Sequence, residues 1–154
     1  MDRDHSVIDT FEVMCNLEPP VFSRIDAKAA AMRMHLQDES TAPAANSATT
    51  RHKVWVGALT DGPFALLLDE MTGPRGTATS CAVVAQVPDV NRFRTVTVTD
   101  MKLPPAAAQP GQGGETSSEW PGVSGPGSTL ILRSIANGER SSVMMKLVFM
   151  QPRQ

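Results

Sequence analysis

A stretch in the last third of the chain, residues 129–150, limits the possible folds most strongly, because two apolar runs there flank the dipeptide Asn137-Gly138. A type I′ turn needs positive φ at both central residues, and Asn-Gly between apolar runs is the strongest short-range signal for a β-hairpin. A two-residue turn at this dipeptide sets Leu130 opposite Met145. We therefore expect two antiparallel strands here, around which the rest of the chain is organised.

The predicted hairpin separates its side chains between two faces, because successive residues of a strand point to opposite sides. One face is entirely apolar and carries Leu130, Leu132, Val143, Met145, Leu147 and Phe149. The other face is mixed and carries Ile131, Arg133, Arg140, Ser142, Met144 and Lys146. A register slip of one residue would scramble this division, so the pattern specifies the pairing. We expect the apolar face to belong to the core.

The size and charge of the chain exclude several classes of protein. Its 154 residues fit one domain, residues 1–154. A domain of this size buries roughly 70% of the surface of its unfolded chain, so it needs neither a metal nor a disulfide merely to fold. The formal net charge of −2 gives no reason to expect a nucleic-acid or anionic-membrane partner. No apolar run approaches the roughly 18 residues of a membrane span.

Two features bear on the cellular compartment. The first eleven residues are charged and lack the apolar segment of a signal peptide, so we expect either a cytoplasmic protein or a chain that starts after a removed signal. Cys15 and Cys81 are compatible with one disulfide, which would contribute about 4 kcal/mol in the chain-entropy model. Two buried free thiols of a cytosolic protein fit the same residues, because free cysteine packs as a small hydrophobe.

The first third of the chain predicts two helices and a connection. Apolar residues recur at helical spacing over residues 5–17 and again over 21–36. Ser23, with Asp26 three residues later, resembles a capping box at the start of the second helix. Residues 38–52 are small and polar, which favours a mobile connection.

Further strands are predicted in the middle of the chain. Residues 54–70 indicate a hairpin around Asp61-Gly62, with Trp55 opposite Leu68. The run of leucines at 66–68 is apolar on both faces, which indicates a central strand.

A third strand and an ambiguous segment follow. The strand covers residues 78–87 and places Cys81 on its apolar face. In the next segment, 89–103, valines alternate with threonines, which favours a strand. Asp89 as a cap and apolar residues at helical spacing favour a helix instead, and we predict a short helix or a helix-like crossover.

The segment 104–128 contains five prolines and six glycines, and we expect it to be irregular and mobile. Loops of this length in a compact domain are either functional or disordered. Trp120 is the one large side chain in the segment. We favour the interpretation that it anchors the segment to the sheet. The alternative is an arm or flap that uses Trp120 to bind a partner.

Motifs that carry chemistry are missing from the sequence. It contains no CxxC, HExxH, P-loop or GxGxxG pattern, and its three histidines have no metal-ligand spacing. We therefore assign no catalytic residue, no metal ligand and no cofactor. Arg75 and Arg133 could bind an anion or a partner, although isolated arginines of this kind are usually solvated.

The order of features resembles a group of small, exported alphaproteobacterial proteins without an assigned activity. The resemblance rests on the F-x-x-x-C pattern that ends at Cys15, the alanine-rich run 25–31, Trp55, Cys81 after a polar loop, and a final strand rich in Met and Leu. In that group the two cysteines are expected to be bonded after export. The resemblance therefore implies a Cys15–Cys81 disulfide and a periplasmic or secreted protein, but no mechanism. The long segment 104–128 departs from the group.

These observations predict an α+β fold, with two N-terminal helices on one antiparallel sheet of about five strands. The leading functional hypothesis is a non-catalytic binding or interaction protein outside the cytoplasm, whose partner is an unknown protein or small ligand. A second hypothesis is a small enzyme with a site assembled from dispersed residues such as His52, Asp69 and Arg75. A third is a cytosolic accessory protein, such as a secretion chaperone, that uses its sheet to form a dimer. The sequence leaves a monomer and a homodimer open.

Overall fold

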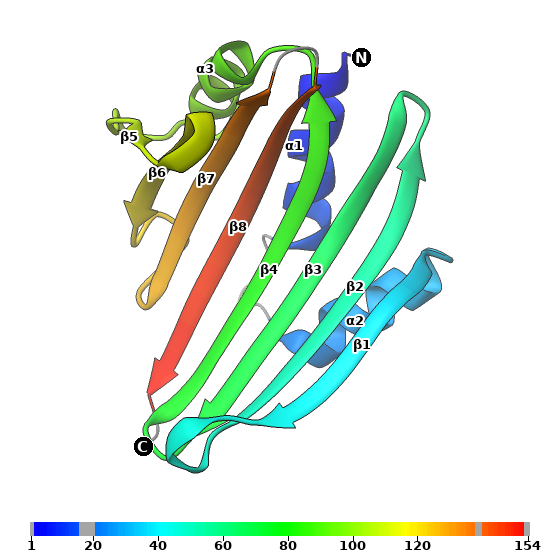
Figure 1. The fold of residues 1–154 in the computed structure, drawn as a ribbon, viewed down its shortest axis with the longest axis vertical. Coiled ribbons are helices and arrows are strands. Elements are labelled where there is room, and N and C mark those ends of the chain that lie inside the picture. Colours follow the sequence, from blue (N-terminus) through cyan, green and yellow to red (C-terminus); the bar gives the residue numbers. More distant parts are fainter. Residues whose placement is uncertain (1, 16–20, 138–139, 153–154) are drawn as a thin grey trace.

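The computed structural model describes residues 2–15, 21–137 and 140–152 of the chain. Within these residues, eight strands form one antiparallel sheet, in the order β1-β2-β3-β4-β8-β7-β6-β5 (Figure 1). The strands in chain order are β1 (His35–Pro43), β2 (Thr49–Leu59), β3 (Gly62–Gly73), β4 (Gly76–Val87), β5 (Gln109–Pro110), β6 (Glu115–Pro121), β7 (Ser128–Asn137) and β8 (Arg140–Pro152). The long strands β4 and β8 pair along twelve residue positions at the centre of the sheet.

The helices cover one face of this sheet. They are α1 (Arg3–Met14), α2 (Phe22–Ala31) and α3 (Val90–Asp100), with short 3-10 turns at η1 (Ala45–Ser47) and η2 (Gln112–Gly114). Helix α1 packs on β4, α2 on β3 and β4, and α3 on β7 and β8. Figure 1 shows α1 and α2 behind the sheet, so the viewer looks at the face that the helices leave open. We call the two sides the helix face and the open face.

The predicted fold class is confirmed in its coarse form, because the chain is α+β with one antiparallel sheet. The predicted strand number is wrong, because the described residues form eight strands rather than about five. The two N-terminal helices are present, but the helices are not all N-terminal, because α3 lies between β4 and β5. The helix predicted in the ambiguous segment 89–103 is confirmed as α3. As predicted, Asp89 caps it: its side chain accepts hydrogen bonds from the backbone N–H groups of Asn91 and Arg92. This cap satisfies donors that the first turn leaves unpaired.

The additional strands come from the two segments that we expected to be irregular. Residues 38–52 belong to β1, η1 and the start of β2, although every residue of β1 is exposed. Small polar residues can pair at the edge of a sheet as well as in a loop, which is why the composition misled the prediction. Residues 104–128 contain β5, η2 and β6. There Trp120 and Ser118 are buried against the sheet, so β6 extends it beyond β7.

Both predicted hairpins exist, and in both the predicted register is wrong by two residues. Leu130 lies opposite Leu147 rather than Met145, and Trp55 lies opposite Leu66 rather than Leu68. A shift of two residues leaves every side chain on its predicted face. The apolar face of the last hairpin is accordingly core, with Leu130, Leu132, Val143, Met145 and Leu147 at most 3% exposed. The turn residues Gly138 and Glu139 lie outside the described residues.

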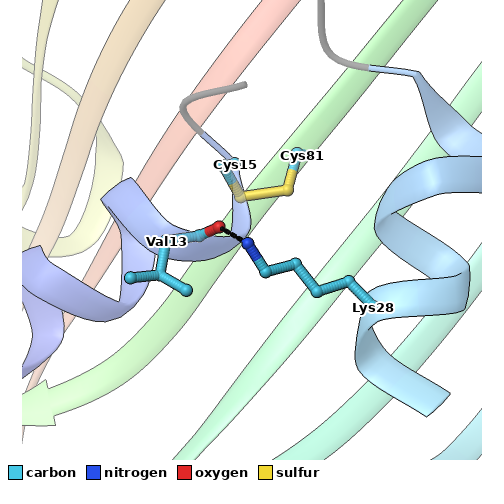
Figure 2. Close-up of a disulfide and its surroundings, with 4 residues drawn as sticks. All are labelled: Val13, Cys15, Lys28 and Cys81. Atoms are coloured by element: carbon cyan, nitrogen blue, oxygen red, sulfur yellow. Dashed lines mark hydrogen bonds between the residues drawn. A yellow bond between two sulfur atoms is a disulfide. The ribbon is translucent and has the colours of Figure 1, made fainter. Parts of the chain in front are cut away.

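The disulfide between Cys15 and Cys81 is present, and it joins the end of α1 to the centre of β4 (Figure 2). Their Cα atoms are 5.4 Å apart and both residues are fully buried. Next to the bond, the Lys28 ammonium of α2 donates a 2.7 Å hydrogen bond to the Val13 carbonyl (Figure 2). A cation at the C-terminal end of a helix is favourable, because the last carbonyls of α1 lack intrahelical partners.

Candidate functional site: the open face and its terminal pocket

The open face of the sheet is not covered by the helices of the described residues. Its side chains form rows across the strands, because antiparallel partners lie side by side. One row runs Val56–Ala65–Val84–Met144 from β2 to β8, and the next runs Val54–Leu67–Ala82–Lys146. Apart from Ala82, which is buried, these side chains are half-buried. These two rows of the open face are therefore apolar apart from Lys146.

A pocket of about 820 Å³ lies at the end of the open face, where β3 turns into β4. Most of its lining is apolar or glycine: Ala45, Ala48, Met71, Gly73, Pro74, Gly76, Ala78, Gly127, Met150 and Pro152. Thr77, Gln151 and Arg75 complete the described lining, and Arg75 is its one charged member. Met71 and Met150 are 50% and 58% exposed, so two flexible apolar side chains stand at the pocket. Pockets of this volume suit small organic ligands.

The walls of the pocket depend on close backbone approaches. Gly127, in the turn between β6 and β7, has a φ of +80° and accepts a 2.8 Å hydrogen bond from the Met150 N–H. A Cβ at this position would lie 2.7 Å from the Met150 carbonyl oxygen, so only glycine fits. On the other side, a Cβ at Gly73 would lie 3.4 Å from the Ala48 Cβ, which places the η1 segment directly against the turn.

A smaller hollow of about 220 Å³ adjoins the pocket, and the two share Met71 and Ala78. Its lining also includes Asp69, Ser80 and Lys146 from the open face. The apolar pocket thus continues toward a polar region at the middle of the sheet.

The polar row at this hollow brings together two of the residues named in the enzyme hypothesis. His52 Nδ1 lies 2.5 Å from Asp69 Oδ1, and Ser80 is the neighbour of Asp69 on β4. Among the hydrogen bonds of the described residues, the His52 imidazole contacts Asp69 and none joins it to Ser80, so this row lacks the serine–histidine contact that activates a serine nucleophile. Arg75 lies apart from this row, in the turn that follows β3. The structure does not assemble the three residues into one site.

The predicted binding residues have different environments. Arg75 is exposed and forms no ion pair within the described part of the chain, so it is available to an anion. Arg133 lies on the open face, where its Nε is 2.8 Å from Glu115 Oε1. Trp120 is 2% exposed, and its indole N–H donates to the Pro104 carbonyl at 2.8 Å. Trp120 therefore anchors residues 104–110 to the sheet and offers no surface to a partner.

The sequence analysis did not identify Met71, Ala78 and Met150 as pocket residues, because no motif in the sequence indicates a pocket. Met71, Ala78 and Met150 are isolated small or flexible apolar residues at strand ends. One signal did exist: the leucines at 66–68 and the Met144-Met145 pair make β3 and β8 apolar on both faces. Such strands are typical of sheets that are covered on both sides.

No three histidine, cysteine, aspartate or glutamate residues of the described ranges 2–15, 21–137 and 140–152 gather closely enough to hold a metal ion. Nor do those ranges contain a helix of the length and hydropathy that a membrane crossing needs. Comparison with protein-family models, with curated proteins and with solved structures finds no match to this chain.

Proposed function

We propose that the protein is a non-catalytic binding protein that takes a small ligand with an apolar body and one anionic group into the pocket at the β3–β4 turn. The observation that carries this proposal is the pocket itself, about 820 Å³ of mainly apolar lining with Arg75 as its charged member. An apolar site with few polar groups that fix orientation is the usual form of a small-molecule site. Arginine prefers carboxylate and related anions, because its planar fork donates two parallel hydrogen bonds.

The compartment in this proposal is extracytoplasmic, either periplasmic or secreted. The Cys15–Cys81 disulfide supports it, because such bonds persist in oxidising compartments and are rare in the cytosol.

The test measures binding of anilinonaphthalene sulfonate, a fluorescent probe with apolar rings and one anionic group, and its displacement by dodecanoate. We expect saturable one-to-one binding and displacement by dodecanoate. The Arg75→Gln variant should bind dodecanoate about tenfold more weakly, the loss of one charge-assisted contact. Dodecanol, which lacks the charge, should bind both proteins equally. Arg24→Gln is the matched control, because Arg24 is an exposed arginine on α2, on the helix face.

A second pair of variants separates the pocket from the rest of the apolar open face. Ala78→Phe places a ring in the pocket and should abolish probe binding. Val54→Phe adds the same ring to the open face outside the pocket and should leave probe binding intact. Binding that survives Ala78→Phe, or dodecanoate affinity that is the same in Arg75→Gln and the parent protein, would contradict the proposal.

A further inference from the structure

Two adjacent rows of the open face, those of Val84 and of Leu67, are apolar over β2, β3, β4 and β8 apart from Lys146. Antiparallel sheets with one face in water alternate apolar and polar residues along each strand. Here Leu67, Val84 and Met144 point to the open side of three adjacent strands, which no helix of the described residues covers. Contiguous apolar patches of this kind on a protein surface mark interaction sites.

Two opposite charges flank the central strand β4 on this face. Lys146 lies on β8, on one side of β4, and forms no ion pair within the described residues. Asp69 lies on β3, on the other side, and is 48% exposed. Lys146 is in the row of Leu67, which is the row next to that of Asp69. The offset along the strands between the two charges is therefore about 7 Å, two residues of rise.

We propose that a second copy of this chain covers the open face, with the two sheets packed face to face about a two-fold axis that runs parallel to β4. Such an axis exchanges the two sides of β4, so β8 of one copy faces β3 of the other. Lys146 then meets the partner's Asp69 across the interface, twice by symmetry. The two residues are then offset by about 7 Å along the strands and by about 10 Å between the packed sheets. A lysine side chain is long enough to span this separation.

The charges favour this axis over a two-fold axis that lies in the same interface plane but runs across the strands. A two-fold axis that ran across the strands through the row of Lys146 would place each Lys146 against its own copy, which is unfavourable. The outer strands also limit the contact. With the axis along β4, Glu119 of β6 would face Asp38 of β1 in the partner, because both lie in the Leu67 row. The contact is therefore confined to the five strands β2, β3, β4, β8 and β7, while the twisted sheets diverge at their edges.

The available area is sufficient for a stable dimer. The five strands have 10 to 13 residues each. The row of Met71, Ala78 and Met150 lines the pocket and is left out of the contact. At about 4.8 Å between strands and about 3.3 Å per residue, the remaining rows offer a surface on the order of 600 Å² per copy, which is the lower end of the area that a standard specific interface buries on each partner. This inference does not rest on the ligand proposed above, because it concerns the centre of the face and is tested without ligand.

Sedimentation equilibrium of the oxidised full chain tests the proposal. We expect a dimer that Val84→Glu converts to a monomer, because the variant puts a charge at the centre of the contact. Met32→Glu is the matched control and should stay dimeric, because Met32 is an equally apolar residue, 51% exposed, that follows α2 and lies away from the open face. Circular dichroism checks that both variants are folded.

A charge-reversal pair tests the predicted contact itself. In the Lys146→Glu homodimer, each contact places two carboxylates against each other, and in the Asp69→Lys homodimer each contact places two ammonium groups against each other. Each variant alone should therefore dimerise at least tenfold more weakly than the unchanged protein. In a mixture of the two variants both contacts regain opposite charges, and a heterodimer should form with an affinity close to that of the unchanged protein. Three results would each overturn the proposal. The first is a chain that is still monomeric at about 100 μM, a concentration far above the dissociation constants of specific dimers. The others are a dimer that survives Val84→Glu and a mixture that forms no heterodimer.

Discussion

At the scale of single residues, Asp26 connects a helix to the sheet more specifically than any apolar contact does. Its Oδ2 accepts a 2.7 Å hydrogen bond from the Lys53 ammonium, and its Oδ1 accepts a 3.0 Å bond from the indole N–H of Trp55. The hydrogen bond to Asp26 is also the main reason why the pKa of Lys53 is raised. Asp26 thus stabilises α2 against β2 by accepting from two donors. The sequence placed it at a helix start as part of a capping box, but the structure shows no side-chain cap there.

Replacement of Asp26 should separate these two roles. Asp26→Ala leaves both the indole N–H and the ammonium without this acceptor, and we expect a loss of about 2 kcal/mol in the free energy of unfolding. Asp26→Asn keeps an amide oxygen for Trp55 and should lose clearly less. Denaturation in guanidinium chloride, followed by tryptophan fluorescence, measures both. Equal losses in the two variants would mean that the ion pair with Lys53 dominates and the indole contact is negligible.

At the scale of elements, α1 is fastened to the sheet at both of its ends. At the start, Arg3 and Ser6 both donate hydrogen bonds of 2.9 Å to the Asp61 carboxylate in the β2–β3 turn. At the end, the Cys15–Cys81 disulfide attaches it to β4 (Figure 2). Between them, Val7, Ile8, Phe11 and Met14 are at most 1% exposed. Helix α1 is thus attached both to β4 and to the β2–β3 turn.

Loss of the disulfide should cost much of the stability of the fold. The bond spans 66 residues, and a loop of that length stabilises by about 4 kcal/mol in the chain-entropy model. We expect the double variant Cys15→Ala, Cys81→Ala to unfold at a markedly lower concentration of guanidinium chloride. In the unchanged protein the bond is fully buried, so dithiothreitol should reduce it only when denaturant is present. A double variant within about 1 kcal/mol of the parent would show that the packing of α1 alone holds this contact.

The elements also show how far the sequence could predict the structure. Periodicity identified α1, α2 and the apolar sides of β4, β7 and β8, because their core residues recur at helical spacing or at every second position. It missed β1, β5 and β6, because their short or polar sequences contain no run of alternating apolar residues. The register errors have one cause: each observed pairing is centred one residue away from the predicted turn dipeptide. The position of the turn is decided by the pairing of the two strands and not by the turn dipeptide alone. The pocket could not be predicted at all, because Ala48, Gly127 and Arg75 meet only through the fold.

At the scale of the whole molecule, charged groups at the ends of the helices couple folding to pH. The pKa of Asp61 is lowered, first by the hydrogen bond from Ser6 and then by Arg3. That contribution is present above the ordinary carboxyl range and is lost as pH falls through the lowered pKa. Burial raises the pKa of Asp4, which is 3% exposed, and this carboxyl therefore opposes Asp61. Because the two act in opposite directions, the acid side of the stability profile should be shallow.

The neutral and alkaline side of the profile depends on His5 instead. Its Nδ1 lies 2.7 Å from Asp2 Oδ1 and its Nε2 lies 3.2 Å from Asp100 Oδ2, so its imidazole links the start of α1 to the end of α3. The hydrogen bond to Asp2 is the main cause of a raised pKa for His5, and the charges of Asp2, Asp100 and Asp9 act in the same direction. Folding therefore favours the protonated ring.

The sign of the pH effect follows from this raised pKa. A group whose pKa is higher in the folded protein contributes stability that is complete below its unfolded pKa, 6.5 for histidine, and lost as pH rises through the folded value. We expect the melting temperature to fall as pH rises from 6 to 8, within the range where histidine titrates. The His5→Ala variant should melt lower at pH 6 and show a flatter profile up to pH 8. The matched control, His35→Ala, removes an exposed histidine at the start of β1 that forms no ion pair within the described residues, and it should keep the slope of the parent protein. An unchanged slope in His5→Ala would show that the contact between α1 and α3 does not depend on the charge of this ring.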